Sequence, residues 1–453
     1  MKNKECTCCE KWKMFFTKSD AAIKAVSLLC LIFAAFLFSA QTANGQTSIK
    51  GVAPVLYPPG GFAVDGNAIS NYLPASIYDS AGDWFSDPAY PGPGGTVFNM
   101  STPDPFDLNY PMAFHWNDGW MQGTDLTIFT QRTKINDAPK TMTWGPGSAP
   151  NKNEINNATV QFSWGDPMLP GGNSKDLWCS FAADRMVNNG SSYIDFEFLQ
   201  QPMYMTGTTS GSFLSLGADS GRTVGDILIT IEFQNGGVAA FAVVQKWQPK
   251  IGGGFEYVEF TPALGDIYCT SNDVMTEAPW LPFGQAQYDV NQYAEGAVNL
   301  THMFNIEQNP CLVLSTVFCR TRTSGSSGTS ELKDFPGAPY QVNLEMSDLA
   351  VTCPAPVNLS ACTSQASVTT AYNTWKSGFG YTGGIVPVTD NIASIPALPG
   401  NFACTGGTLN FTYIAIDSCG KTDSCSSSFS AAQPTALVIH CPAPVNLTGC
   451  TSQ

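Results

Sequence analysis

The chain has 453 residues and a formal net charge of −15, and only 13% of its residues are charged. It has 36 acidic and 21 basic residues, so it lacks the positive surface needed to bind nucleic acids or anionic membranes. Both are therefore excluded as partners. Its 42 glycines and 31 prolines, with many Thr, Ser, Asn and aromatic residues, favour a secreted all-β protein.

Residues 1–45 have the pattern of a signal peptide. Several lysines precede a 16-residue apolar run at 25–40, which is shorter than the ~20 residues that a membrane-spanning helix needs. The small residues Ala43 and Gly45 then form a cleavage site. We expect a mature chain that begins near Gln46, lies outside the cell or on its outer surface, and does not insert into a membrane. The alternative is an uncleaved N-terminal anchor.

Cleavage would leave 11 of the 15 cysteines, none of them in a Cys-x-x-Cys metal or redox pattern. In an exported chain, cysteines are expected to form disulfides. Cys311 and Cys319 bracket one strand-like run and are too far apart in extended chain to bond each other, so each needs another partner. The three histidines are widely separated, which disfavours a histidine-based metal site or catalytic triad.

Residues 47–350 are predicted to form one large β-sandwich head domain of the jelly-roll or concanavalin-like class. Proline and glycine punctuate this segment, and no stretch of about 15 residues has a convincing helical period. Strand-like runs recur too often for a simple immunoglobulin domain. These runs are Asp125–Gln131, Ala158–Trp164, Leu177–Ala182, Tyr193–Leu199, Gly225–Phe233, Val238–Trp247, Tyr257–Phe260, Ala297–Leu300, Cys311–Phe318 and Gln341–Leu349.

The run at 193–198 alternates strictly between apolar and polar residues. Ile194, Phe196 and Phe198 fall on one face, whereas Asp195 and Glu197 fall on the other. The run at 225–233 has the same pattern, and two such strands predict stacked antiparallel sheets with an apolar face inside and an acidic face outside.

Six further pieces of the head form a recognisable pattern. They are Tyr57-Pro-Pro-Gly-Gly-Phe62, Gly82-Asp-Trp84, Glu154-Ile-Asn-Asn-Ala158, Asp184–Phe198, Gly221–Gly237 and Glu331-Leu-Lys-Asp-Phe335. On these pieces the head resembles a group of secreted Bacteroidota domains of unassigned function. The resemblance implies a secreted or cell-surface protein and no known reaction.

Asp195 and Glu197 are candidate ligand-binding residues. Their strand is similar to the Glu-x-Asp-x-Glu strand of retaining glycosidases of concanavalin-like fold, in which the first Glu is the nucleophile. Tyr193 stands at that position here, so the resemblance implies carboxylates that bind sugar hydroxyls but no catalytic residue. The alternative is an acidic face that is simply solvated or hydrogen-bonded to neighbouring loops.

Trp116 and Trp120 are the second candidates, because sugars stack on tryptophan faces while nearby Asn and Asp bind their hydroxyls. The alternative is that these rings fill the core or its rim. Calcium is considered because Asp and Asn are plentiful, but no Asp-x-Asp-x-Asp loop occurs, so neither a metal nor another cofactor is expected.

A repeat begins after the head. Residues 353–365 recur at 441–453 with 11 of 13 positions identical and an offset of 88 residues. One complete unit therefore spans 351–440. A second, truncated unit begins at 441–453, and we expect further repeats downstream of it.

Within the unit, Thr408–Asp417 and Ser427–Phe429 read as the two arms of a hairpin. The unit resembles the HYR-like, immunoglobulin-type repeats of large secreted Bacteroidota proteins, and the match is carried by Val388–Asn391 and Phe411–Cys425. The resemblance implies a β-sandwich stalk module without chemistry of its own. Of the five cysteines in the unit, Cys419 and Cys425 are the expected disulfide, across the neck of the hairpin.

Together these patterns predict a secreted or cell-surface, adhesin-like protein. The head would bind a polysaccharide or a surface protein without cleaving it, and the repeats would form a stalk. Two alternatives stay open, an extracellular glycoside hydrolase or lyase and a purely structural surface component.

Overall fold

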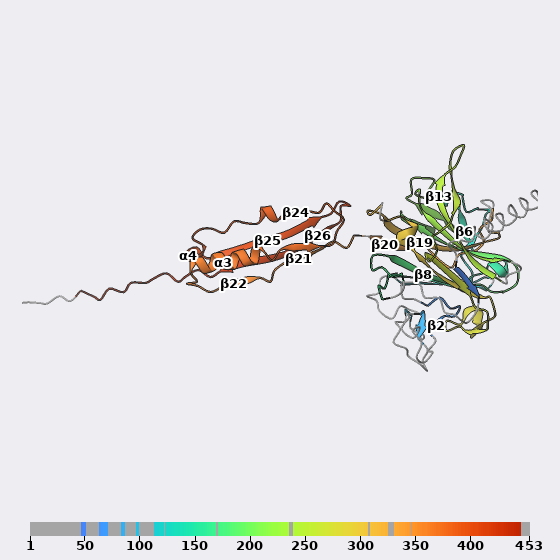
Figure 1. Ribbon diagram of the computed structural model, residues 1–453, viewed down its shortest axis with the longest axis horizontal. Helices are drawn as coiled ribbons and strands as arrows, with labels where there is room; N and C mark the ends of the chain where they lie inside the picture. The colour runs from blue at the N-terminus through green and yellow to red at the C-terminus, as the bar shows by residue number, and fades with distance from the viewer. Residues whose placement is uncertain are drawn as a thin grey trace, which may run out of the picture. The chain divides into compact units, whose positions relative to one another are not determined.

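The computed structural model describes residues 47–50, 63–70, 83–86, 97–98, 113–121, 123–168, 171–234, 239–306, 309–324, 330–345 and 347–444 (Figure 1). The predicted signal peptide and most of the truncated second repeat lie outside these ranges. The chain divides into two compact units, Met1–Leu344 and Glu345–Gln453. Strands dominate both, which confirms the predicted all-β class. Among the described residues, no helix is long and apolar enough to cross a membrane.

The first unit contains two six-stranded sheets. The outer sheet has the order β1 (Thr47–Lys50), β15 (Ile267–Ser271), β18 (Tyr293–Asn299), β8 (Leu177–Asp184), β7 (Asn157–Trp164), β4 (Ala113–Asn117). The central sheet has the order β14 (Phe255–Phe260), β13 (Ala239–Pro249), β12 (Ile227–Gln234), β9 (Ser192–Leu199), β19 (Val313–Arg322), β20 (Tyr340–Glu345). Every strand-like run found in the sequence of the head overlaps a strand of the structure.

The outer and central sheets pack face to face through the apolar side of β9. Ile194, Phe196 and Phe198 are all fully buried. The ring centroid of Phe196 lies 5.0 Å from that of Phe181 on β8. The predicted stacking of two sheets around this strand is confirmed.

A third layer covers the other face of the central sheet and was not predicted. This small sheet has the order β10 (Met203–Gly207), β11 (Gly211–Ser215), β6 (Thr143–Gly145), β5 (Ile128–Phe129). Leu228 and Phe318 flank Glu197 in the strand register, on the face that was expected to be solvated. The Phe318 ring packs 5.3 Å from that of Phe213 on β11, so the acidic face of β9 is an interior surface.

Two short pairs of strands complete the described part of the first unit. β2 (Ile69–Ser70) pairs in parallel with β3 (Phe85–Ser86). β16 (Thr276–Glu277) and β17 (Gln287–Tyr288) form an antiparallel hairpin whose connection includes the 3-10 turn η4 (Pro282–Gly284).

The second unit has a four-stranded sheet in the order β22 (Val357–Leu359), β26 (Thr422–Ala431), β25 (Gly407–Ile416), β24 (Thr389–Asp390). A further pair joins β21 (Ala350–Thr352) to β23 (Gly380–Thr382). The predicted hairpin is confirmed as β25 and β26, which pair along their full length. A four-residue helix, α4 (Phe402–Thr405), precedes β25.

A helix that was not predicted, α3 (Gln365–Lys376), packs on this sheet (Figure 1). Ser364 caps its first turn by accepting a hydrogen bond from the main chain of Ser367. Val368, Tyr372 and Trp375 lie on one helix face and are buried, and Trp375 contacts Phe429 of β26 with ring centroids 5.8 Å apart. The core of this unit is therefore formed by a sheet and a helix together.

The predicted disulfide between Cys419 and Cys425 is wrong. Cys425 bonds to Cys353 instead, 72 residues earlier in the chain. Cys425 lies within β26, opposite Tyr413, and it packs against the same core as Cys353. The expectation of general disulfide pairing is also wrong for six free cysteines, the buried Cys179, Cys269 and Cys319 and the exposed Cys362, Cys404 and Cys441.

Candidate functional site

Asp195 and Glu197 belong to a buried ion-pair network between the central and small sheets. Glu197 is bound by two arginines, with Oε1 at 2.6 Å from Nε of Arg222 and Oε2 at 2.7 Å from Nη1 of Arg320. Oδ1 of Asp195 lies 3.0 Å from Nε of Arg322. All five side chains have at most 1% of their surface exposed, so no ligand in solution can reach these carboxylates.

The arginines keep Glu197 ionised. Burial alone would raise its pKa, but the charges of Arg222 and Arg320 and a hydrogen bond from the Tyr257 hydroxyl outweigh burial and lower the pKa to about 2. The prediction that Asp195 and Glu197 bind a ligand is wrong, because both are enclosed between two layers of sheet and paired with arginine.

Trp116 is also part of the interior. It is 3% exposed, its Nε1–H donates to the main-chain oxygen of Ala338 at 2.8 Å, and its ring centroid lies 4.6 Å from that of Tyr340. A ring that stacks on a ligand must have at least one face open to solvent. The prediction that Trp116 stacks on a ligand is therefore wrong, and the alternative that it fills the core holds.

Trp120 occupies a different environment, in the loop between β4 and β5. It is only half-buried, and its ring meets that of Phe283 edge to face with centroids 6.0 Å apart. Phe283 lies in η4, where Leu281 and Phe283 both have φ near 52°. Leu281 is 60% exposed, so apolar surface is available beside this turn. Trp120 stays a candidate for ligand stacking.

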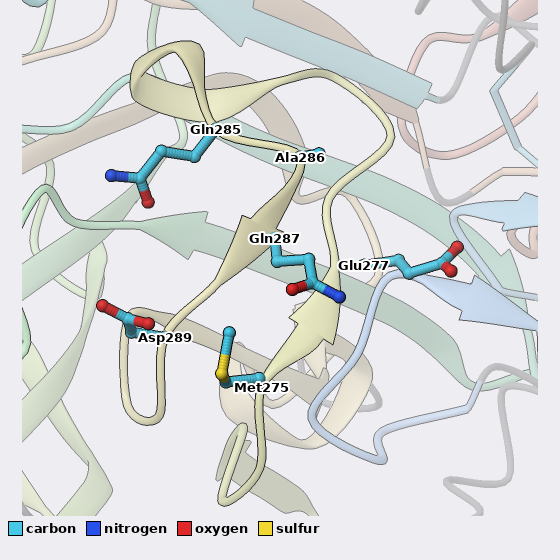
Figure 2. Close-up of a pocket in the computed structure, with 6 residues that line it drawn as sticks. All are labelled: Met275, Glu277, Gln285, Ala286, Gln287 and Asp289. Atoms are coloured by element: carbon cyan, nitrogen blue, oxygen red, sulfur yellow. The ribbon is translucent and has the colours of Figure 1, made fainter.

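The β16–β17 hairpin carries a surface hollow with a volume of about 590 Å³ (Figure 2). Its lining combines carboxylates, amides and one thioether, and all six residues are exposed. They are Met275, Glu277, Gln285, Ala286, Gln287 and Asp289. Sequence analysis missed this hollow, because nothing in the spacing of these residues marks them as neighbours in the folded chain.

The hairpin is held firmly from below. Tyr288 lies between the exposed residues Gln287 and Asp289 and is itself 1% exposed. Its hydroxyl donates to Oδ2 of Asp184 on β8 at 2.9 Å and accepts from Nε1 of Trp280 at 2.6 Å. The polar groups of the hollow are therefore mounted on a strand that is anchored to the outer sheet.

Four carboxylates also lie near one another at the end of β4, and they were not predicted because three separate segments of the chain contribute them. We call Asp118, Asp125, Glu154 and Asp334 the acidic cluster. One carboxylate oxygen from each of Asp118, Asp125 and Asp334 lies within 4.8 Å of the other two. Asp118 and Asp125 bracket the loop that carries Trp120.

Burial and mutual repulsion raise the pKa values in the acidic cluster. Burial and the charge of Asp125 raise the pKa of Asp118 to about 7. Burial and the charges of Asp125 and Asp118 raise the pKa of Glu154 to about 8. Burial and the charge of Glu154 raise the pKa of Asp334 well above its usual range.

Comparison with known proteins gives little. No family model and no curated protein matches the chain. One solved structure with a distant likeness contains the M60 catalytic domain with the CBM51-1 and CBM51-2 domains from Clostridium perfringens ZmpB. The two chains are 9% identical, the match covers 67% of this chain and 24% of that chain, and the TM-score is 0.13. A similarity this low supports no statement about fold, ligand or activity.

Proposed function

We propose that the chain is an exported, adhesin-like protein whose first unit binds a glycan or protein ligand without cleaving it. The second unit would be the first module of a stalk. The signal-peptide pattern and the 88-residue repeat support export and repetition. The disulfide between Cys353 and Cys425 fits an oxidising compartment outside the cytoplasm.

The observation that carries the proposal is the hollow on the β16–β17 hairpin (Figure 2). Glu277 and Asp289 offer hydrogen-bond acceptors, and the amides of Gln285 and Gln287 offer both donors and acceptors. Sugar hydroxyls need this mixture, since each is both donor and acceptor. The half-buried ring of Trp120, which packs on the turn of the same hairpin, would add an apolar stacking surface.

Binding is favoured over cleavage because the two carboxylates of β9 are buried. The glycosidase alternative depended on Asp195 and Glu197, and glycoside cleavage requires two carboxyl groups that flank the scissile bond. Both are enclosed between sheets and paired with arginine. They cannot contact a polysaccharide while the sheets stay packed.

The exported chain should be tested for retention on a panel of immobilised polysaccharides and surface proteins, and the same samples assayed for new reducing ends. We expect retention on at least one ligand with no reducing ends released. Retention on none would favour a purely structural role. Release of reducing ends that disappears in Glu277→Gln would replace the proposal with a hydrolase whose acid lies in the hollow.

A further inference from the structure

The acidic cluster has an arrangement of oxygen atoms that is not explained by contacts within the protein. Oδ2 of Asp125, Oε1 of Glu154 and Oδ1 of Asp334 are all buried, and none has a hydrogen-bond partner. These three residues are 1%, 3% and 0% exposed, so solvent does not satisfy the oxygens either. Buried carboxylate oxygens are costly without a partner, and a cation bound among them would remove that cost.

The remaining oxygens of the cluster are held by the surrounding chain, which orients the unpartnered ones. Oδ2 of Asp334 accepts from the main-chain N–H of Ile155 at 2.8 Å. Oδ1 of Asp125 accepts from the N–H of Thr127 at 3.0 Å, and the Thr127 hydroxyl donates to Asp118. Asp125 and Asp334 are therefore each held through one carboxylate oxygen while the other oxygen is unpartnered.

Within the described part of the chain, no basic side chain pairs with the acidic cluster. Among the described residues, Lys, Arg and His form no ion pair within 4.0 Å of any of its four carboxylates. The carboxylates of the β9 network, by contrast, are each matched by arginine. Among the residues that the structure describes, arginines therefore pair with the acids of β9, and no cationic side chain pairs with the acidic cluster.

We propose that the acidic cluster binds one divalent cation, and that calcium is the ion that fits it best. Calcium binds oxygen ligands at about 2.3–2.6 Å, so two oxygens on one ion lie at most about 5 Å apart. The oxygens of Asp118, Asp125 and Asp334 satisfy this limit, since all lie within 4.8 Å of one another. Zinc is disfavoured because the set contains no cysteine or histidine. Three converging carboxylates also suit calcium better than magnesium, which keeps several waters and is usually bound by one or two carboxylates.

A bound ion would connect three parts of the first unit. Asp118 and Asp125 close the loop that carries Trp120, Glu154 precedes β7, and Asp334 follows β19. The ion would fix the loop against both large sheets. This inference does not depend on the ligand proposed above.

Titration of the exported full chain with CaCl₂ after treatment with a chelator tests the site directly. Isothermal calorimetry should give one calcium per chain, and calcium should raise the melting temperature. Asp334→Asn and Asp125→Asn should each weaken calcium binding by at least about tenfold. The matched control is Glu259→Gln on β14, an exposed carboxylate outside the cluster, which should bind as the wild type does.

Both Asp→Asn variants remove one like charge from a repulsive group, so they should fold without the ion. A wild-type chain that shows neither heat nor a melting shift up to about 10 mM calcium would overturn the site. Unchanged calcium affinity in both variants would place the ion elsewhere and also overturn it. Tighter binding of MgCl₂ than of CaCl₂ would contradict the assignment to calcium.

Discussion

Nε of Arg222 lies 2.6 Å from Oε1 of Glu197, and neither side chain has any surface exposed to solvent. Arg222 comes from the loop before β12, whereas Glu197 belongs to β9 at the centre of the sheet. The guanidinium also lies over the rings of Trp247 and Tyr257, at 4.8 and 5.3 Å from their centroids. Arg222 therefore contacts both the buried carboxylate of Glu197 and the aromatic rings beside it.

Glu197→Gln should destabilise the first unit strongly. The substitution leaves Arg222 and Arg320 buried without their carboxylate, and breaking a buried pair in this way costs about 3–5 kcal/mol. Urea unfolding of the full chain measures the loss. The exposed Glu259→Gln should change the free energy of unfolding by no more than about 0.5 kcal/mol. Equal stability of the two variants would show that the network contributes nothing.

Acid should destabilise the chain partly through Glu197. Its folded pKa of about 2 lies below the ordinary value of 4.5, so its contribution is complete above pH 4.5 and is lost as the pH falls toward 2. At about 1.36 kcal/mol per pH unit, the contribution is about 3 kcal/mol. The difference in unfolding free energy between wild type and Glu197→Gln should shrink over this window. A difference that is constant from pH 6 to pH 2.5 would contradict the lowered pKa.

The alternation along β9 correctly predicted which residues form the core, but it could not show what covers the opposite face. Strand β5 has two residues and β6 has three, so the layer that buries Asp195 and Glu197 leaves almost no periodic signal. The partner charges were visible, since Arg320 and Arg322 alternate on β19, but their meaning depends on the strand order. The acidic cluster could not be predicted either, because Asp118 and Asp334 meet only in the folded chain.

In the second unit, helix α3 was predictable from the sequence. Val368, Tyr372 and Trp375 have the spacing of a buried helix face, and Ser364 is a favoured cap, so α3 was readable. The disulfide was not readable, because five cysteines allow many pairings and only the arrangement of strands brings Cys353 to Cys425.

Removing the disulfide should destabilise the second unit. Cys353→Ser opens a loop with a sequence separation of 72 residues, for which chain entropy gives a loss of about 4 kcal/mol. Thermal unfolding of the full chain should show a lower transition for the second unit and an unchanged one for the first. Cys404→Ser, at an exposed free cysteine, is the control and should leave both transitions in place. The pairing would be contradicted if the transition of the second unit were unchanged in Cys353→Ser and lower in Cys404→Ser.

Trp116→Ala should act on stability. Its ring is enclosed by Tyr340 and hydrogen-bonded to Ala338, so truncation leaves a cavity and costs about 3–5 kcal/mol. Denaturant unfolding measures this loss. Ligand retention by the fraction that stays folded should equal that of the wild type. A variant of normal stability that has lost ligand binding would restore Trp116 as a binding residue.

The most direct test of the proposed function is the affinity of the full chain for whichever ligand it retains best, compared among the wild type, Trp120→Ala, Gln287→Ala and Glu259→Gln. We predict a wild-type Kd in the micromolar to millimolar range, or about −8 to −4 kcal/mol. Each of the first two variants should weaken binding by about tenfold, because each removes one contact from the hollow or its rim. Glu259→Gln should bind normally, and the ligand should be recovered uncleaved. Unchanged affinity in both Trp120→Ala and Gln287→Ala would contradict the assignment of binding to this hairpin, and a cleaved ligand would contradict binding without catalysis.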